Sequence, residues 1–436
     1  MRIVRVLCVA AGLLGVMACN ELGEIISDLG GDSSPITISS PTPTEQLTKV
    51  SLNETQKSYV SAGNSMAFRL LKELYDGKNM VCSPLSLQYA LAMAANGAEG
   101  ETLQQIIDLL GYGSDGIDAL NEYSKILMEQ LPAVDLDVTL KVTDGIIVKN
   151  EFSLLPAYKE KVEKYYYAAV ENMDFSNPKV IANRVNQWAS KNTNGFIDKV
   201  LDESDISPET VALLMNALYF KAKWAGTDYE PMFMIEATGS EDFTTAGGQK
   251  LKMDMMHNVR YHQYAEMDGF TVLALPYAGG KFFMYFLLPE KNDINGLLAK
   301  MQTLSWNDVL SSFKQDAEVH VAIPKFDIEE RYDLDKALKS MGMKKPFQAG
   351  AAEFDSMFAN AKGYNFWIDK IIQKAKISVA EWGTEAAAVT VELMAGEAAP
   401  GEEPKRVFFY ADHPFVFLIG EATSGTLLFE GVFSGK

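Results

Sequence analysis

The residues that most often carry out catalysis are few and scattered in this chain of 436 residues. Its histidines stand outside any triad or metal-binding motif, and they are His257, His262, His320 and His413. Ser311 and Lys314 match the S-x-x-K pattern of one hydrolase class, but the companion motifs of that class are missing. His257 and His262 lie five apart without a third ligand nearby, so we expect surface or loop positions for both. The sequence therefore predicts no catalytic centre, no metal site and no cofactor.

The charge of the chain narrows the classes of partner. The formal net charge is −19, and Lys and Arg form no cluster of the kind that binds phosphate groups. We therefore expect no nucleic-acid partner. An acidic surface that keeps the protein soluble is the simplest interpretation, and a cationic partner stays open.

One segment near the C-terminus has unusually small side chains. Residues 381–390 read EWGTEAAAVT, follow the strand-like run KIIQKAKISVA and precede a polar segment that contains proline. Alanine favours helix, but Gly383, Thr384, Val389 and Thr390 oppose it. The pattern predicts the point where a strand leaves a sheet, with side chains small enough to enter a strand slot.

The parity of this segment supports insertion into a sheet. Successive side chains of a strand point to opposite faces. One face would therefore carry only small or β-branched side chains, those of Thr384, Ala386, Ala388 and Thr390. Glu385, Ala387 and Val389 would point the other way. Glu392 continues the inward parity, so a deep insertion would carry a carboxylate towards the core.

Hydrophobic periodicity predicts a mixed α+β domain with large, mainly antiparallel sheets. Helices are expected after Ser83-Pro84, over the stripe from Leu103 to Leu110 that Gly111 ends, and after Asn177-Pro178. A further helix is expected at 335–340. Strands dominate later, and we expect them at 211–220, 270–275, 282–288, 319–323 and in two C-terminal runs joined by a turn at 422–425.

The N-terminus resembles an export signal. Arg2 and Arg5 precede a short apolar run, which is too short for a membrane-spanning helix. The residues Val16 to Cys19 resemble the lipobox of bacterial lipoproteins, whose cysteine becomes the lipidated N-terminus. We expect a signal peptide at 1–18, a lipidated flexible tether at 19–50 and one domain at 51–436. An ordinary signal peptide with a chance cysteine is the alternative.

This interpretation leaves Cys82 as the only thiol of the mature body. No internal disulfide is then possible, so packing alone must stabilise the fold. Cys82 follows the apolar Val81, and we expect a buried small hydrophobe there rather than a nucleophile. The exported protein is expected in the bacterial cell envelope, anchored by lipid at the outer membrane, with its periplasmic or surface orientation open.

Several motifs together resemble the serpin family of protease inhibitors. The segment 381–390 resembles the hinge of inhibitory serpins, and the order of the other motifs follows the family. These are Ser83-Pro84-Leu85-Ser86 beneath the opening of the sheet, the N-A-x-x-F-K-x-x-W strand from Asn216 to Trp224, and Asp412-His413-Pro414-Phe415-Val416-Phe417 after the reactive loop. Asn186 resembles the asparagine of the family's mid-sheet cluster, and Gln373 stands where the family commonly has histidine.

The resemblance implies a serpin fold with an exposed reactive-centre loop at about 381–407. It also implies a suicide mechanism, in which a target protease cuts the loop, becomes acylated and is carried away as the loop inserts into the sheet. The hinge would comprise Glu381, Gly383, Thr384, Glu385, Ala386, Ala387, Ala388 and Thr390. Sheet opening would involve Ser83, Ser86, Asn186, Trp224 and Gln373. The partner is a protease bound covalently, and we expect a monomer.

By the same analogy the reactive bond lies sixteen residues after Glu381, at Glu397-Ala398, with neighbours Met394, Ala395 and Ala399. Small flanking residues favour an elastase-like or subtilisin-like enzyme, and a Glu-selective protease is the competing interpretation. Papain-like cysteine proteases are a further class of target. Trp382 and Glu392 depart from the hinge pattern and motivate the alternative, a non-inhibitory serpin that acts as a binding or carrier module.

Overall fold

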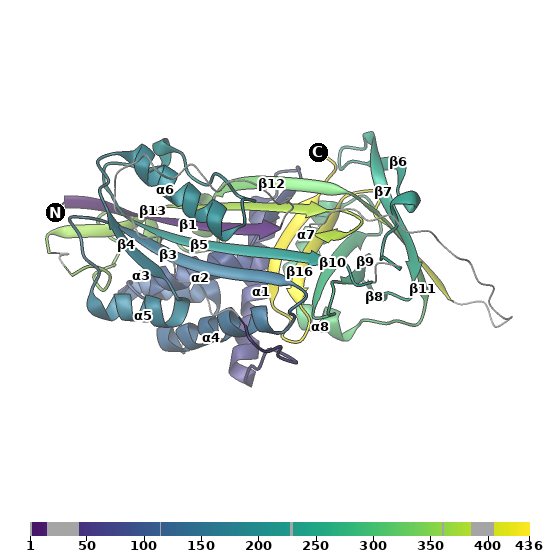
Figure 1. The fold of residues 1–436 in the computed structure, drawn as a ribbon, viewed down its shortest axis with the longest axis horizontal. Helices are drawn as coiled ribbons and strands as arrows, with labels where there is room; N and C mark the ends of the chain where they lie inside the picture. Colours follow the sequence, from purple (N-terminus) through teal and green to yellow (C-terminus); the bar gives the residue numbers. More distant parts are fainter. Residues whose placement is uncertain (1, 15–42, 114, 227–229, 360–361, 385–404) are drawn as a thin grey trace.

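A computed structural model describes residues 2–14, 43–113, 115–226, 230–359, 362–384 and 405–436 of the chain. In the N-terminal piece, side chains are described for Arg5 to Cys8. The structure has three sheets with helices packed around them (Figure 1). The α+β class and the serpin-type arrangement of large sheets are confirmed.

The largest sheet runs along most of the molecule (Figure 1). Its strands follow the order β12 (Phe326–Asp333), β13 (Tyr364–Val379), β1 (Arg2–Leu14), β5 (Thr210–Lys223), β3 (Thr139–Lys149) and β4 (Ala169–Met173). A short strand, β14 (Gly383–Thr384), adds to β5. This sheet thus holds Gly383 and Thr384, the described end of the hinge predicted from the sequence.

Two further sheets complete the body. The second has the order β2 (Met80–Cys82), β17 (Leu427–Phe433), β16 (Phe415–Glu421), β10 (Phe282–Pro289), β9 (Phe270–Pro276) and β8 (Gln263–Met267). The third has the order β15 (Arg406–Tyr410), β11 (Glu318–Pro324), β7 (Lys250–Arg260) and β6 (Gly239–Thr244). Most neighbouring strands are antiparallel, as expected. The parallel pairs are β15 with β11, β4 with β3, and β1 with both β5 and β13.

The helices begin and end where their sequences direct. They are α1 (Glu54–Leu74), α2 (Pro84–Ala95), α3 (Gly100–Leu110), α4 (Gly116–Gln130), α5 (Pro156–Tyr166), α6 (Pro178–Asn192), α7 (Ile294–Met301), α8 (Trp306–Ser311) and α9 (Asp335–Ser340). The side chains of Ser83 and Asn177 accept hydrogen bonds from the first turns of α2 and α6. Gly111 ends α3 in the left-handed region, at φ 79°. The predicted helices are confirmed.

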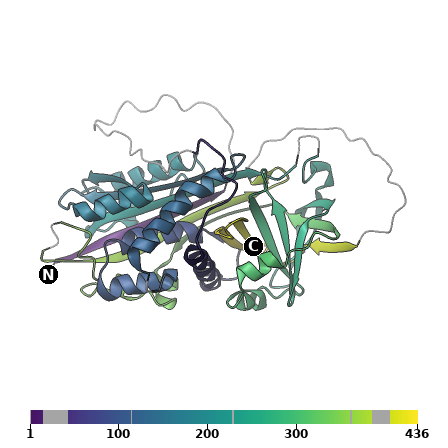
Figure 2. The same ribbon diagram turned by 90° about the horizontal axis from the view of Figure 1, so that it is seen from below.

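The two faces of β5 belong to different apolar clusters. Leu214, Leu218 and Phe220 point into the main core, whereas Leu213 and Met215 point into a smaller cluster built largely from α6. Figures 1 and 2 show the helices distributed over both faces of the large sheet. A strand placed beside β5 therefore buries side chains on both faces.

The N-terminal strand β1 fills the position between β5 and β13 and is parallel to both (purple in Figure 1). Val6, Leu7 and Cys8 are at most 1% exposed. Arg5 forms an ion pair with Asp369 at 3.3 Å, and its N–H donates to the carbonyl of Glu209 at 2.7 Å. The segment predicted to be an export signal is thus seated as a strand in the middle of the sheet.

The last residues of the predicted tether lie against the body. The N–H of Leu47 donates to the carbonyl of Ala133 at 2.7 Å, and the N–H of Val50 donates to Thr423 Oγ1 at 3.1 Å. Ordered contacts with the domain therefore begin a few residues before 51. In the described part of the chain, no helix has both the length and the apolar character needed to cross a bilayer.

Candidate functional site: the hinge and the middle of the large sheet

The chain reverses direction at the end of β13 through a tight turn. Ala380 and Gly383 exchange two backbone hydrogen bonds of 3.1 Å, with Glu381 and Trp382 between them. Gly383 and Thr384 then pair antiparallel with β5, opposite Lys223 and Ala222. The hinge has therefore already entered the sheet by two residues.

Gly383 is required by this close approach. Its φ is 131°, and a Cβ at this position would lie 2.4 Å from the carbonyl oxygen of Ala222. A side chain is excluded on both counts, since L-residues rarely adopt such a φ and the obstructing atom belongs to the backbone. The glycine of the hinge motif thus allows the chain to meet the edge of β5.

A stack of aromatic rings supports the first inserted residue. The rings of Trp224 and Tyr277 lie parallel with centroids 4.7 Å apart. Trp224 Nε1 donates to the carbonyl of Ala380 at 2.8 Å, and the hydroxyls of Tyr277 and Thr384 are 2.6 Å apart. Thr384 is fully buried. Trp224 thus lies beside the turn where the chain joins β5, and Thr384 faces inward. A role of either residue in loop insertion stays a prediction.

Glu381 anchors the turn to two other segments. Its carboxylate is 3.0 Å from Lys325 Nζ and accepts a hydrogen bond from Thr238 Oγ1 at 2.8 Å. Burial acts to raise the pKa of this carboxyl, but its own backbone N–H, Lys325 and Thr238 outweigh burial and lower the pKa. The carboxylate stays charged and holds the start of the hinge in place.

Polar side chains gather beneath the middle of the sheet on the β5 side. Ser86 Oγ donates to Asn216 Oδ1, and Asn216 Nδ2 donates to Asp144 Oδ1 at 2.8 Å. All three residues are fully buried. Burial raises the pKa of Asp144 to about 8 even though the bond from Asn216 lowers it. Asp144 is therefore mostly protonated at neutral pH.

The β13 side of the same region is held by Gln373. Its amide Nε2 donates to the carbonyl of Ser83 at 2.8 Å, and its Oε1 accepts from the N–H of Ser83 at 3.1 Å. Ser83 Oγ donates to the carbonyl of Leu428. Gln373 ties β13 to the start of α2 through an amide. Because an amide does not ionise, this contact does not depend on pH near neutrality.

Asn186 does not belong to this cluster, which corrects the sequence prediction. It lies on α6, where its Oδ1 accepts from the N–H groups of Val200 and Leu201. The asparagine of the mid-sheet cluster is Asn216. Its place in the N-A-x-x-F-K-x-x-W motif was the signal that could have assigned it, because that motif already locates the strand.

The hinge and the N-terminal strand occupy consecutive stretches of one edge of β5. β14 pairs with Lys223 and Ala222, and β1 pairs from Phe220 back to Thr210. Ala10 of β1 stands opposite both Asn216 and Gln373, so β1 separates the two halves of the polar cluster. Any continuation of the hinge along β5 requires the positions that β1 holds.

Comparison with known proteins decides the family. The model of the serpin (serine protease inhibitor) family matches residues 61–435. The chain belongs to the serpin family. An uncharacterized serpin-like protein of Thermococcus kodakarensis is 33% identical over 86% of this chain and 85% of its own, and Serpin-ZX of Arabidopsis thaliana is 31% identical over 85% and 97%.

Solved structures agree with this serpin assignment. The thermophilic serpin tengpin in the native state is 27% identical with a TM-score of 0.78, over 90% of this chain and 97% of that one. The native stressed conformation of an Arabidopsis serpin is 31% identical with a TM-score of 0.73, over 88% and 98%. Serpins are generally protease inhibitors rather than enzymes, and the family supports a function of that type here.

Some sequence predictions for this serpin fall outside the described residues. They concern Cys19, the hinge from Glu385 to Thr390, and the reactive bond with its neighbours at 394–399. The far end of the predicted loop, at 407, lies inside β15, which begins at Arg406. The loop is therefore slightly shorter at this end than the sequence suggested.

The histidines and the S-x-x-K pattern form no active site. His257 lies on β7 and bonds Glu241 at 2.7 Å. His262 lies in the loop between β7 and β8, as one alternative predicted, but it is buried rather than at the surface. It bonds Asn258, and burial lowers its pKa to about 4. Lys314 forms an ion pair with Glu266 at 3.3 Å rather than facing Ser311. Cys82 is buried, as predicted, and its thiol lies 3.4 Å from Glu430 Oε1.

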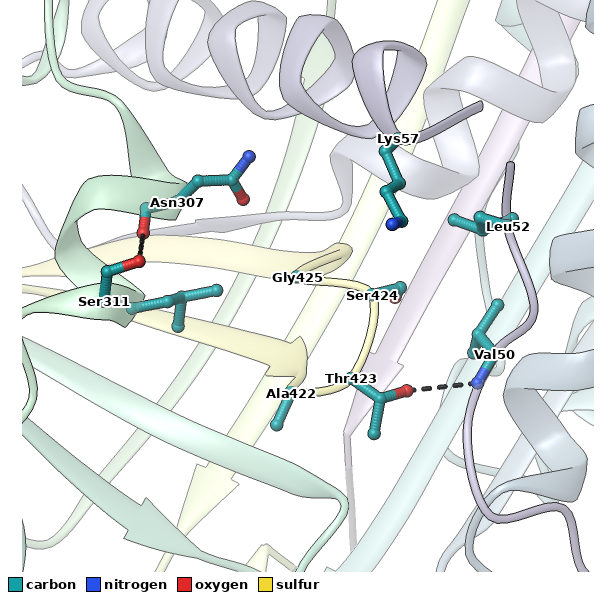
Figure 3. A pocket seen from close by; sticks show the side chains of 10 residues that line it. Val50, Leu52, Lys57, Asn307, Ser311, Ala422, Thr423, Ser424 and Gly425 are labelled. Atoms are coloured by element: carbon teal, nitrogen blue, oxygen red, sulfur yellow. Dashed lines mark hydrogen bonds between the residues drawn. The ribbon is translucent and has the colours of Figure 1, made fainter. Parts of the chain in front are cut away.

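A cavity of about 280 Å3 lies beside the turn between β16 and β17 (Figure 3). Ser311, Asn307 and Lys57 contribute to its wall, and Ser311 Oγ donates to the carbonyl of Asn307 at 2.8 Å. The hydroxyl of Ser311 is thus engaged with its own helix, and Lys57 pairs with Glu54 at 2.7 Å. The residues that line this cavity are not those of the hinge.

Proposed function

We propose that this serpin is a suicide inhibitor of serine proteases that works by inserting its cleaved loop beside β5. The observation that carries the proposal is the antiparallel pairing of Gly383 and Thr384 with β5, directly after the turn from β13. An insertion needs a formed turn, a started register and an acceptor edge. The hinge has the turn and the started register, and the edge of β5 would become available once β1 leaves it.

Extending the pairing of β14 along β5 would place the reactive bond at the end of that strand. Each further loop residue would stand opposite the preceding residue of β5, so Thr390 would face Asn216 and Gly396 would face Thr210, where β5 begins. The proposed bond at Glu397-Ala398 would then lie just beyond the end of the strand. A protease acylated there would be carried the full length of β5.

The inserted side chains would fit the two faces that the neighbours of β5 define. Residues with the parity of Thr384 would join the main core, where Leu218 and Phe220 already point. Glu385 would stand opposite Lys221, whose side chain is on the α6 face and only partly buried. Small side chains inward and a carboxylate beside a cation are both favourable.

The chemistry belongs to the protease, and the serpin interrupts it. The serine Oγ of the protease attacks the carbonyl carbon of the residue before the cut bond, the amine leaves with a proton, and an acyl ester links the two proteins. Insertion would then move the ester before water hydrolyses it. We favour elastase-like and subtilisin-like targets over a Glu-selective one, with papain-like enzymes as a further class.

A trypsin-like target at Lys405-Arg406 fits the structure poorly. Lys405 Nζ bonds Tyr264 Oη at 2.6 Å and lies 3.6 Å from Asp316, and Arg406 is the first residue of β15. Cleavage there would require the start of β15 to leave its sheet. A substrate bond must instead be presented in extended form to the protease cleft.

The proposal includes removal of residues 1–18 and lipidation of Cys19. Removal would take β1 out of the sheet and free the edge of β5 from Phe220 to Thr210. Lipid on Cys19 would hold the mature serpin at the cell envelope, proposed here as the outer membrane. Processing of the N-terminus would therefore both anchor the protein to the membrane and make the edge of β5 available for loop insertion.

The alternative, a non-inhibitory binding module, rests on Glu392 and Trp382. Trp382 lies in the turn before β14 rather than in the slot, and its carbonyl accepts the N–H of Trp224 at 3.1 Å. Its size therefore does not obstruct insertion. Glu392 stays the observation in favour of this alternative, because its predicted inward parity would bury a carboxylate.

The decisive experiment mixes residues 19–436, with Cys19→Ser to avoid lipidation, with pancreatic elastase, subtilisin and a glutamyl endopeptidase. We expect a denaturant-resistant complex on a gel and a released C-terminal peptide whose mass identifies the cut bond. Complete cleavage by all three enzymes without such a complex would exclude the inhibitory function.

A further inference from the structure

The outer face of the third sheet exposes large apolar side chains that the fold does not use. Phe408 and Tyr410 on β15 are 60% and 45% exposed, and Val259 on β7 and Tyr261 just after it are 50% and 54% exposed. Among the residues that the structure describes, eight large hydrophobic side chains are exposed. Half of them gather on this one sheet, which is typical of an interaction surface rather than of scattered surface residues.

Strand register brings these side chains together. The parallel pairing of β15 with β11 places Phe408 opposite His320, and the antiparallel pairing of β11 with β7 places His320 opposite Val259. Tyr410 occupies the next row, with its ring 5.7 Å from that of Phe408, and the ring of Phe408 is 4.9 Å from that of His320. Phe408, Tyr410, His320 and Val259 therefore form one continuous surface, and Tyr261 follows closely after Val259 at the end of β7.

The opposite face of the same strands anchors the sheet. Val319 and Val321 of β11 and Phe409 of β15 alternate with the outward residues and are at most 1% exposed. Glu318 stands between His320, at 3.0 Å, and Arg406, at 3.8 Å. The exposed rings stand on hydrogen-bonded strands whose other face packs in the core. Binding a partner would therefore cost little conformational entropy.

This surface lies close to the reactive bond along the chain. Arg406, the first residue of β15, follows Ala398 by eight residues, which span at most about 28 Å when fully extended. A protease domain of some 230 residues is about 45 Å across, by the usual scaling of size with length. An enzyme that holds the reactive bond can therefore reach the outer face, which lies at the end of the molecule where Figure 1 labels β7 and β11.

We propose that the outer face, made of Val259, Tyr261, Phe408 and Tyr410, is a docking surface for the target protease and contacts an apolar surface beside the active-site cleft of that enzyme. The proposal rests on the inhibitory function proposed above. Exposed aromatic anchors of this kind commonly dominate the energy of protein interfaces. The surface would select among proteases that all accept the same small residues in the loop.

The test compares a double variant, Phe408→Ala with Tyr410→Ala, with a control, Val180→Ala, in the 19–436 chain that carries Cys19→Ser. Val180 on α6 is also 50% exposed. With the fastest-reacting protease among elastase, subtilisin and glutamyl endopeptidase, we expect the second-order rate constant of complex formation to fall about 10- to 100-fold in the double variant. Its stoichiometry of inhibition and its melting temperature should stay unchanged, and the control should match wild type.

Each result bears on the proposal. Unchanged rate constants with every protease that wild type traps would overturn the docking surface while leaving the inhibitory function intact. Failure of wild type to trap any of the three would remove both proposals. Sedimentation that shows a wild-type dimer, lost in the double variant, would reassign the outer face to contact between two copies of this chain.

Discussion

Two segments of this serpin add to the same edge of β5, and they do so in opposite directions. β14 is antiparallel to β5 and continues from β13 through a two-residue turn, whereas β1 is parallel and arrives from the N-terminus. The backbone of β5 accepts both, since main-chain hydrogen bonding does not depend on side-chain identity. Under the proposed mechanism, β1 and the loop would therefore compete for this edge.

The side chains of the two segments differ in kind. β1 buries Val6 in the main core and Leu7 in the cluster of α6, so it packs on both sides like a permanent strand. The hinge brings alternating small residues with one hydroxyl already seated against Tyr277. A segment that must enter an assembled sheet profits from small side chains, because large ones would require the core to repack.

The largest expected effect is on stability after loop cleavage. In the 19–436 chain, cutting with elastase should let about a dozen residues pair with β5. At about 0.5 to 1.5 kcal/mol per hydrogen bond, the unfolding free energy should rise by roughly 6 to 18 kcal/mol. Calorimetry before and after cleavage would show a melting temperature raised by tens of degrees.

The full-length chain is the matched control for this prediction. Because β1 holds the edge from Phe220 to Thr210, cleavage should leave the melting temperature of the full-length chain nearly unchanged. An equal rise in both chains would show that β1 does not compete with the loop. No rise in either chain would favour the non-inhibitory alternative.

The next largest effect concerns the first inserted side chain. Thr384→Arg would place a cation where Thr384 is fully buried against Tyr277, so insertion should stall and the protein should become a substrate. Burying the cation should cost more than about 1.4 kcal/mol, which corresponds to at least about a tenfold rise in the stoichiometry of inhibition. The protease should still cut the same loop bond. Thr384→Ser keeps the hydroxyl and should inhibit normally, and continued inhibition by the arginine variant would rule out insertion.

A smaller effect is expected at Glu392, which lies outside the described residues. Continuing the register of β14 would set it opposite Leu214, on the face of the main core. Glu392→Thr should remove a buried carboxylate from the inserted strand, speed insertion several-fold and lower the stoichiometry of inhibition towards one. Glu385→Thr, of opposite parity, is the control and should not speed insertion, because it removes a carboxylate that would stand beside Lys221. Equal responses of the two variants would contradict the predicted parity.

The last prediction is a pH dependence of stability from Asp144, on the β5 side of the slot. Its pKa is about 8 in the folded protein against an ordinary value of 3.8, so the folded state keeps a proton that the unfolded chain loses. The unfolding free energy should therefore fall as pH rises from about 4 to about 8, by up to about 1.4 kcal/mol per pH unit.

The variant Asp144→Asn isolates this contribution. It should lack this part of the pH dependence in urea unfolding curves measured across that window. Gln373→Glu offers a comparison on the β13 side, where wild type has only a neutral amide in contact with Ser83. A slope that Asp144→Asn leaves unaltered would assign the titration to other groups.

Much of the fold could be predicted because its signals are local. Ser83-Pro84 and Asn177-Pro178 start helices through caps that act within three residues, and Gly111 ends one through its own φ. The hinge was predictable for a similar reason, since the parity of small residues is visible in the segment itself. Tyr277 was missed because nothing beside it in the sequence marks it as the partner of Thr384.

The amino-acid sequence by itself predicted the serpin family, the position of the hinge and an inward parity of which only the first member, Thr384, lies within the described residues. Only the tertiary structure decided that Asn216 rather than Asn186 completes the polar cluster, that Asp144 joins it, and that residues 2–14 take the strand position the loop would need. These facts depend on contacts between segments far apart in the chain, such as Ser86 with Asn216. Local sequence patterns specify strands and helix caps. Which strand pairs with which depends on all the strands that compete for the same sheet edges.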